Sequence, residues 1–137
     1  GLAIHHSFRS YVATVIDVEV QGKDIKVHDA YVVLDCGTHI NPDTCVAQME
    51  GAVVFGLSLA LKSEITFDKG SAVQGNLDTY ELIRMMESPR VKVDLVQSEA
   101  LPAGVGEPGV PPVAPALTNA IFAASGQRIR KLPVSLA

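Results

Sequence analysis

Two β-branched runs separated by a short glycine-containing turn constrain the fold of this chain more than any other feature. Residues 11–20 and 25–34 are rich in valine and isoleucine, and the connection at 21–24 contains Gly22. β-branched side chains favour extended backbone, and a glycine in a short connection favours a tight reversal. These residues therefore predict a β-hairpin.

The segment after the hairpin predicts a long helix from Pro42 to Lys62. Asn41 can cap its N-terminus, Pro42 suits the first helical position, and Asp43 complements the helix dipole. Apolar residues recur at helical spacing and continue around the other faces, so we expect this helix to be almost wholly buried. Glycines at 51 and 56 each cost about 1 kcal/mol relative to alanine, which predicts that a neighbour approaches closely there.

The remaining pattern predicts a second hairpin over 63–73, a strand over 91–96, a loop over 101–112 and a helix over 113–125 that ends at Gly126. Strands in pairs with two separated helices indicate the α+β class, with antiparallel hairpins packed on two helices. The length of 137 residues corresponds to a single domain spanning 1–137.

Composition limits the classes of function. Hydrophobic residues make up 47% of the chain and charged residues 19%, which excludes intrinsic disorder. A net charge of −4 argues against nucleic acid as a partner, and no charge-free apolar run is long enough to predict a membrane span. The chain begins with apolar residues and without methionine, which favours a piece of a longer polypeptide. The sequence does not indicate the cellular compartment.

The segment from Pro102 to Pro115 is the most unusual stretch, because it holds five of the eight prolines and three of the eleven glycines. Prolines fix backbone torsions and glycines let other atoms approach, so this loop is expected to be stiff with room beside it. Its one ionisable side chain is Glu107, and no lysine, arginine or histidine occurs from 93 to 127. A desolvated, unpaired carboxylate has its pKa raised toward the working pH, which would make Glu107 a proton acceptor; a solvated glutamate at a turn is the alternative.

Two other motifs carry little weight. The glycines at 104, 106 and 109 match a dinucleotide-binding fingerprint, but the strand before it, the helix opening at it and the acid about 20 residues later are all missing. Cys36, His39 and Cys45 could in principle supply metal ligands, yet their spacing fits no standard site and small buried cysteines are common. We therefore predict no metal held by protein side chains.

Several ordered motifs resemble a known family. They are Asp35-Cys36-Gly37, Asn41-Pro42-Asp43, Gln48-Met49-Glu50-Gly51 and the loop sequence from Gly104 to Pro115. Over nearly all of its length the chain resembles the C-terminal part of the large subunit of molybdenum hydroxylases, the xanthine oxidase and aldehyde oxidase family. Within that family it is most similar to the β subunit of isoquinoline 1-oxidoreductase-type enzymes.

The resemblance implies specific roles for four residues. Glu107 occupies the place of the general base that removes a proton from a molybdenum-bound hydroxyl, whose oxygen attacks a carbon of a nitrogen heteroaromatic or an aldehyde. Gln48 corresponds to a helical glutamine that contacts the pterin. Gly104 and Gly106 would keep the metal-facing side of the loop open. The implied fold is that of the molybdopterin-binding domain.

The resemblance also implies cofactors and partners. The cofactor would be molybdopterin with molybdenum, in the cytosine dinucleotide form, and electrons would leave through iron–sulfur clusters on a small partner subunit. Large subunits of the family are several times longer than 137 residues, so we expect the remainder of that subunit as a partner and an isolated fragment to be inactive. The alternatives are a non-catalytic interaction domain that docks a partner through the Gly/Pro-rich loop, and a stand-alone homologue that has lost catalysis.

Overall fold

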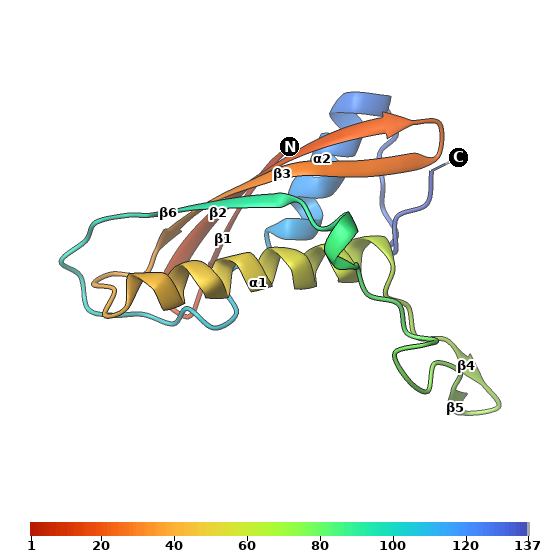
Figure 1. The fold of residues 1–137 in the computed structure, drawn as a ribbon, viewed down its shortest axis with the longest axis horizontal. Coiled ribbons are helices and arrows are strands. Elements are labelled where there is room, and N and C mark those ends of the chain that lie inside the picture. Colours follow the sequence, from red (N-terminus) through yellow and green to blue (C-terminus); the bar gives the residue numbers. More distant parts are fainter. Residues whose placement is uncertain (137) are drawn as a thin grey trace.

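The computed structural model describes residues 1–136 and contains a four-stranded sheet with two helices on one of its faces (Figure 1). A small separate hairpin and one 3-10 turn complete the secondary structure. In chain order the elements are β1 (Leu2–Ser7), β2 (Ser10–Gln21), β3 (Asp24–Asp35), α1 (Pro42–Leu61), β4 (Phe67–Asp68), β5 (Ser71–Ala72), η1 (Met85–Glu87), β6 (Arg90–Leu95) and α2 (Val113–Ser125).

The sheet has the order β1-β2-β3-β6. β1, β2 and β3 pair antiparallel, which confirms the predicted first hairpin, and the β2–β3 register shifts at a bulge between Asp17 and Val18. β6 pairs with β3 in parallel, so the sheet is mixed, although the α+β class is confirmed. Period-two alternation identifies a strand but not its direction, and the long connection through α1 permits a parallel return.

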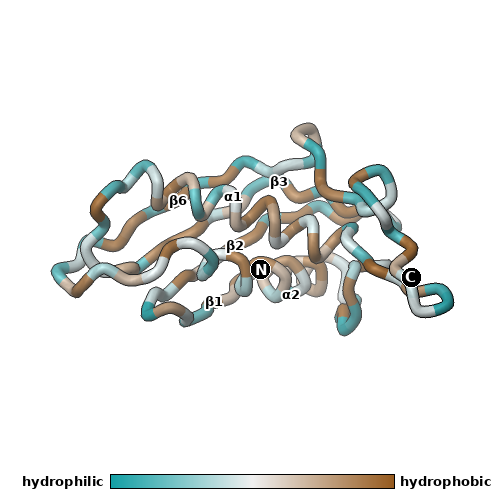
Figure 2. The backbone as a smooth tube through the Cα atoms, turned by 90° about the horizontal axis from the view of Figure 1, so that it is seen from below, coloured by the Kyte–Doolittle hydropathy of each residue, from teal (hydrophilic) through white to brown (hydrophobic). Residues whose placement is uncertain are grey.

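The core lies between the sheet and the two helices. The valines and isoleucines that point inward from β2 and β3 alternate with exposed neighbours, as the two-residue period of a strand requires. Hydrophobic colouring follows the strands and helices, whereas hydrophilic colouring gathers at the turns (Figure 2). The largest fully buried hydrophobic side chains of this core are Val12, Ile16, Val32, Leu34, Met49, Val53, Leu57, Val113, Leu117 and Ile121.

The helix α1 begins at Pro42 as predicted, with the side chain of Asn41 accepting a hydrogen bond from the Thr44 amide. The expectation that it is almost wholly buried is wrong, since Phe55 is 54% exposed and Gly51 is also exposed. Only the side toward the sheet and α2 is covered. By length and composition α1 could cross a membrane, but core helices pass the same test and α1 packs as one.

The predicted close approach occurs at Gly56 and not at Gly51. A Cβ at Gly56 would lie 2.7 Å from the Cβ of Val113, so this glycine lets α2 begin directly against α1. A Cβ at Gly51 would meet no atom within 4 Å. Gly56 therefore serves helix packing, whereas the backbone at Gly51 borders open space.

The outward face of the sheet is apolar and uncovered by any described element. Its exposed large side chains come from alternate positions on three neighbouring strands, and His6 stacks on Tyr11 among them with ring centroids 4.1 Å apart. Single exposed apolar residues are ordinary, but a contiguous set indicates a surface that another element covers. The apolar members are Leu2, Ile4, Tyr11, Val15, Tyr31 and Val33.

Candidate functional site

A concave site of about 640 Å³ lies between β1, the middle of α1 and the loop that precedes α2. Three separate segments of the chain therefore contribute to it, and its wall combines apolar side chains with a few polar ones. It is lined by His5, Ser7, Phe8, Gln48, Gly51, Ala52, Phe55, Gly106, Glu107, Val110 and Pro111.

The loop over 102–112 is fixed to the β1–β2 turn and to the end of β3. The Ala103 amide donates to the carbonyl of Cys36 at 2.9 Å, and the Gly104 amide donates to the carbonyl of Phe8 at 3.0 Å. The buried hydroxyl of Ser10 donates to the carbonyl of Gly104 at 2.6 Å. These bonds hold a segment without regular secondary structure in one conformation, as expected from its glycine and proline content.

The same loop is also packed directly onto α1. Pro108 and Gly109 are both buried, and a Cβ at Gly109 would lie 2.7 Å from the Cβ of Ala52 and 2.9 Å from the Sδ of Met49. Only glycine allows the loop backbone to approach the helix this closely. The two residues before this contact are Glu107 and Gly106, so the contact determines where both of them lie.

The structure brings Gln48, Gly106 and Glu107 together. Gln48 projects from α1, and its Nε2 donates to the carbonyl oxygen of Gly106 at 3.2 Å. A Cβ at Gly106 would approach only that Nε2, at 3.9 Å, so there is space where a side chain would project from Gly106. All three residues line the cavity.

Glu107 lies at the rim of this cavity and its side chain is exposed. Within residues 1–136 no hydrogen bond or ion pair engages its carboxylate, and the loop contributes no cation beside it. The absence of a local partner agrees with the sequence. The desolvation expected from the sequence is not supplied by residues 1–136, because Glu107 is exposed.

Gly104 has a different environment from Gly106. It does not line the cavity, its amide donates to Phe8 of the β1–β2 turn and its carbonyl accepts from Ser10 at the start of β2. A Cβ there would lie 2.7 Å from the Cβ of Phe8. The contacts of Gly104 thus explain the glycine by protein packing, without any bound molecule.

The cysteines near the N-terminus of α1 have the features of core residues. Cys36 and Cys45 are free and buried. Burial raises the pKa of the Cys36 thiol, and Cys45 beside it acts in the same direction, so Cys36 stays protonated. In the part of the chain that the structure describes, no three His, Cys, Asp or Glu side chains are grouped to hold a metal ion.

Five residues of the cavity wall do not follow from the sequence motifs: His5, Ser7, Phe8, Ala52 and Phe55. His5 and Ser7 share one side of β1, and Phe8 begins the β1–β2 turn with a positive φ of 53°. The only signal in the sequence was the pair His5-His6, because consecutive residues of a strand face opposite sides and one of the two histidines is therefore expected to point inward. Their place beside Glu107 depends on long-range contacts that no local pattern contains.

Comparison with known proteins identifies the family of this chain. The family model for the molybdopterin cofactor-binding domain matches residues 4–89. The chain is 34% identical over 136 residues to the β subunit of isoquinoline 1-oxidoreductase from Brevundimonas diminuta, covering 98% of this chain and 17% of that protein. It is 41% identical over 103 residues to a membrane-bound aldehyde dehydrogenase from Gluconacetobacter polyoxogenes whose name specifies pyrroloquinoline quinone, covering 75% of this chain and 13% of that protein.

Solved structures share the fold. The aldehyde oxidoreductase from Desulfovibrio gigas superimposes with a TM-score of 0.78 over 90% of this chain and 14% of that chain, at 23% identity. The chain thus spans less than a fifth of the length of the relatives it matches. These matches confirm the resemblance inferred from the loop and helix motifs. The chain belongs to the molybdopterin cofactor-binding domain family of the molybdenum hydroxylases.

Proposed function

We propose that this chain is the C-terminal part of the large subunit of a molybdenum hydroxylase, with Glu107 as its general base. The reaction would oxidise a nitrogen heteroaromatic or an aldehyde with water as the oxygen source. The observation that carries the proposal is the convergence of Gln48, Gly106 and Glu107 on one cavity, in a chain of this family. A carboxylate held on a stiff loop is suited to proton transfer because its position is fixed beforehand.

The cavity wall fits a bound molybdopterin. Gly51 and Gly106 leave backbone exposed, so a planar group can approach α1 and the loop without meeting a Cβ. Gln48 uses one amide N–H on Gly106, which leaves its carbonyl oxygen and second N–H for a ligand. The Ser7 hydroxyl oxygen is buried without a partner in the described chain, and such a group is expected to be bonded in a complete site.

In this proposal Gln48 and Gly106 contact the cofactor, and Gly104 holds the loop that presents them. When bound, the molybdenum cofactor supplies the redox chemistry of the reaction. Glu107 accepts a proton from the oxygen nucleophile at its carboxylate. Because Glu107 is exposed in this chain, the cover that excludes water from it has to come from the remainder of the subunit.

The proposed remainder of the subunit is supported by two observations. The chain matches 13% and 17% of the length of the two curated relatives, and the outward face of the sheet presents a contiguous apolar surface. We further propose a cytosine dinucleotide form of the cofactor and a small subunit with iron–sulfur clusters, on the likeness to isoquinoline 1-oxidoreductase. The chain alone is then expected to bind little molybdenum, and near-stoichiometric metal in the isolated chain would contradict this.

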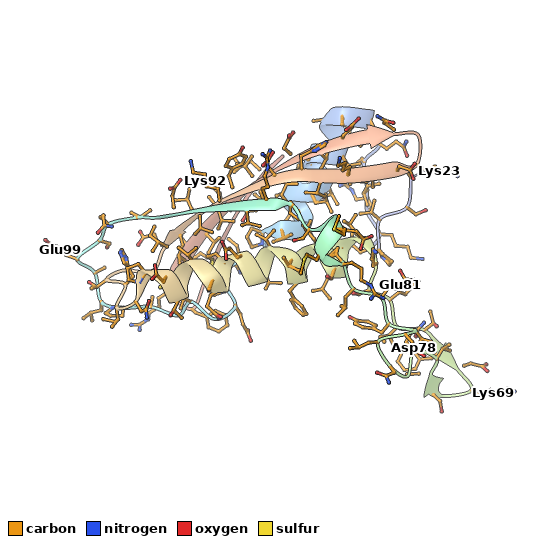
Figure 3. The ribbon with its side chains drawn as sticks, in the orientation of Figure 1. Lys23, Lys69, Asp78, Glu81, Lys92 and Glu99 are labelled. Atoms are coloured by element: carbon orange, nitrogen blue, oxygen red, sulfur yellow. The ribbon has the colours of Figure 1, made fainter. Side chains whose placement is uncertain are left out.

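The test is the substitution Glu107→Gln in the intact enzyme. We expect turnover to fall by about 10²–10⁴, the contribution of general base catalysis, while molybdenum content stays unchanged because the amide keeps the shape of the side chain. Glu99→Gln is the matched control, since Glu99 is exposed on the connection after β6 and outside the cavity (Figure 3). Full turnover in Glu107→Gln would refute the base and favour a loop that docks a partner protein.

A further inference from the structure

His5 shares the cavity with Glu107 and Gln48, although it lies about a hundred positions away from the loop in sequence. β1 alternates, so that Ala3, His5 and Ser7 are half-buried toward the helices while their neighbours are exposed. The adjacent His6 therefore faces the opposite side of the sheet, where it stacks on Tyr11. Two consecutive histidines thus occupy different environments, and only the first contributes to the site.

The imidazole of His5 has no protein partner. No hydrogen bond or ion pair engages either of its ring nitrogens among residues 1–136, although the side chain is half-buried. Ser7, two residues along the same side of the strand, has a buried hydroxyl oxygen that is also unpaired. Buried polar groups are normally bonded, so the unpaired Ser7 hydroxyl indicates that a bound molecule completes this wall, and the unengaged imidazole of His5 lines the same cavity.

The polar groups of the cavity are unevenly distributed. Gln48 and His5 can donate hydrogen bonds from the α1 and β1 sides, and Glu107 is the carboxylate on the loop side. No lysine or arginine lines the cavity. Among its lining side chains, the imidazole of His5 is therefore the one best able to stabilise a negatively charged atom of a ligand. Apolar side chains fill the space between, with Phe8 and Phe55 as the aromatic members.

From this arrangement we infer that His5 is a ligand-binding residue whose imidazole N–H donates to an oxygen of the molecule seated in the cavity. The inference rests on the proposed function for the identity of the site. The ligand atom is an oxygen that carries negative charge or belongs to a carbonyl group. Such an oxygen occurs both on the pterin cofactor and on polar substrates, and the experiment separates the two sources.

The experiment compares His5→Phe, His5→Gln and the control His6→Phe in the intact holoenzyme. Molybdenum per subunit is measured first, and KM and kcat are then measured on the loaded fraction. If the oxygen belongs to the cofactor, His5→Phe lowers molybdenum content at least fivefold with KM unchanged. If it belongs to the substrate, metal content is unchanged and KM rises about tenfold with little change in kcat, as for a lost contact worth about 1.4 kcal/mol.

His5→Gln keeps an N–H donor without the aromatic ring and is expected to recover part of either loss. If His5 had only a structural role, His5→Phe and His5→Gln would both lower thermal stability. Neither a selective loss of molybdenum nor a selective rise in KM would then be seen. His5→Phe that equals wild type in metal content and KM overturns the inference. If Glu107→Gln still lowers turnover by about 10²–10⁴ in that case, the proposed function stands. A wild-type enzyme that contains no molybdenum overturns both the proposed function and the inference about His5.

Discussion

Two irregular segments of the molecule differ in how they are held. The loop over 102–112 is hydrogen-bonded to the β1–β2 turn, to the end of β3 and to α1, and it buries Pro108 and Gly109. The connection over 63–84, which we call the arm, extends away from the body and carries the β4–β5 hairpin (Figures 1 and 3). Lys69 and Asp78 mark its distal part in Figure 3.

The arm is bonded largely to itself. Thr66 pairs with Gln74, and the hydroxyl of Thr79 accepts from the amides of Gly75 and Asn76. Its hydrogen bonds to the body are near its ends, where the Ser63 amide donates to the Ser58 carbonyl and the Ile83 amide donates to the Ser58 hydroxyl. The loop is held in place by hydrogen bonds and packing contacts with other segments, whereas most of the arm lacks such contacts, so only the loop is suited to position a catalytic group.

The largest effect is expected for an added methyl group in the buried loop. Gly109→Ala places a Cβ 2.7 Å from the Cβ of Ala52 and 2.9 Å from Met49, so it should lower the free energy of unfolding by about 1–3 kcal/mol. Gly75→Ala makes the same change in the arm, where no atom lies within 4 Å, and should stay within about 0.5 kcal/mol. Chemical denaturation of both variants measures the difference, and equal values would show that the loop is no more constrained than the arm.

A smaller effect is expected for the hydrogen bond that holds Gly104. Ser10→Ala removes the 2.6 Å bond from a fully buried hydroxyl and should cost about 1 kcal/mol. Amide hydrogen exchange at Gly104 should accelerate about fivefold, because local opening becomes easier by that amount. Ser71→Ala in the exposed strand β5 is the control, and it should leave exchange in both regions unchanged. Unchanged exchange at Gly104 in Ser10→Ala would mean that other contacts suffice to hold the loop.

Much of the fold could be predicted because its signals are local. The turn at Gly22, the cap at Asn41 and the left-handed Gly126 after α2 each act within a few residues, and the structure places all three as predicted. The parallel pairing of β6 could not be predicted, since strand direction depends on the path of the whole chain. The hairpin expected over 63–73 is reduced to two residues per strand because the arm has no sheet to extend.

The candidate site could be predicted less fully than the fold. The residues alone indicated a stiff loop with an unpaired acid, and the resemblance added Gln48 and Gly106, which the structure brings beside Glu107. The exposure of Glu107 and the wall formed by His5 and Phe8 depend on how β1 meets the loop. The strand lies near one end of the chain and the loop near the other, so no local pattern contains the contact between them.

The smallest effect is expected where the arm returns to the body. Lys62 at the end of α1 pairs with Glu87 of η1 at 2.6 Å, and this hydrogen bond, together with the Arg84 amide, holds the pKa of Glu87 below its usual 4.5. A carboxyl whose pKa is lowered by folding stabilises the folded state above its unfolded pKa, and this contribution is lost as the pH falls through the folded value. The contribution should be small and reduced by salt because Glu87 is exposed.

Thermal unfolding of wild type and Lys62→Gln at neutral and acidic pH measures this contribution. The variant should unfold at a slightly lower temperature at neutral pH and low salt, and the difference should vanish once the pH is well below 4.5, where Glu87 is protonated in both states. Hydrogen exchange of the Ile83 amide, which donates to Ser58 at the same junction, shows whether the effect is confined to the root of the arm. A difference that persists at acidic pH would mean that Lys62 acts through packing of its alkyl chain against the body and not through its charge.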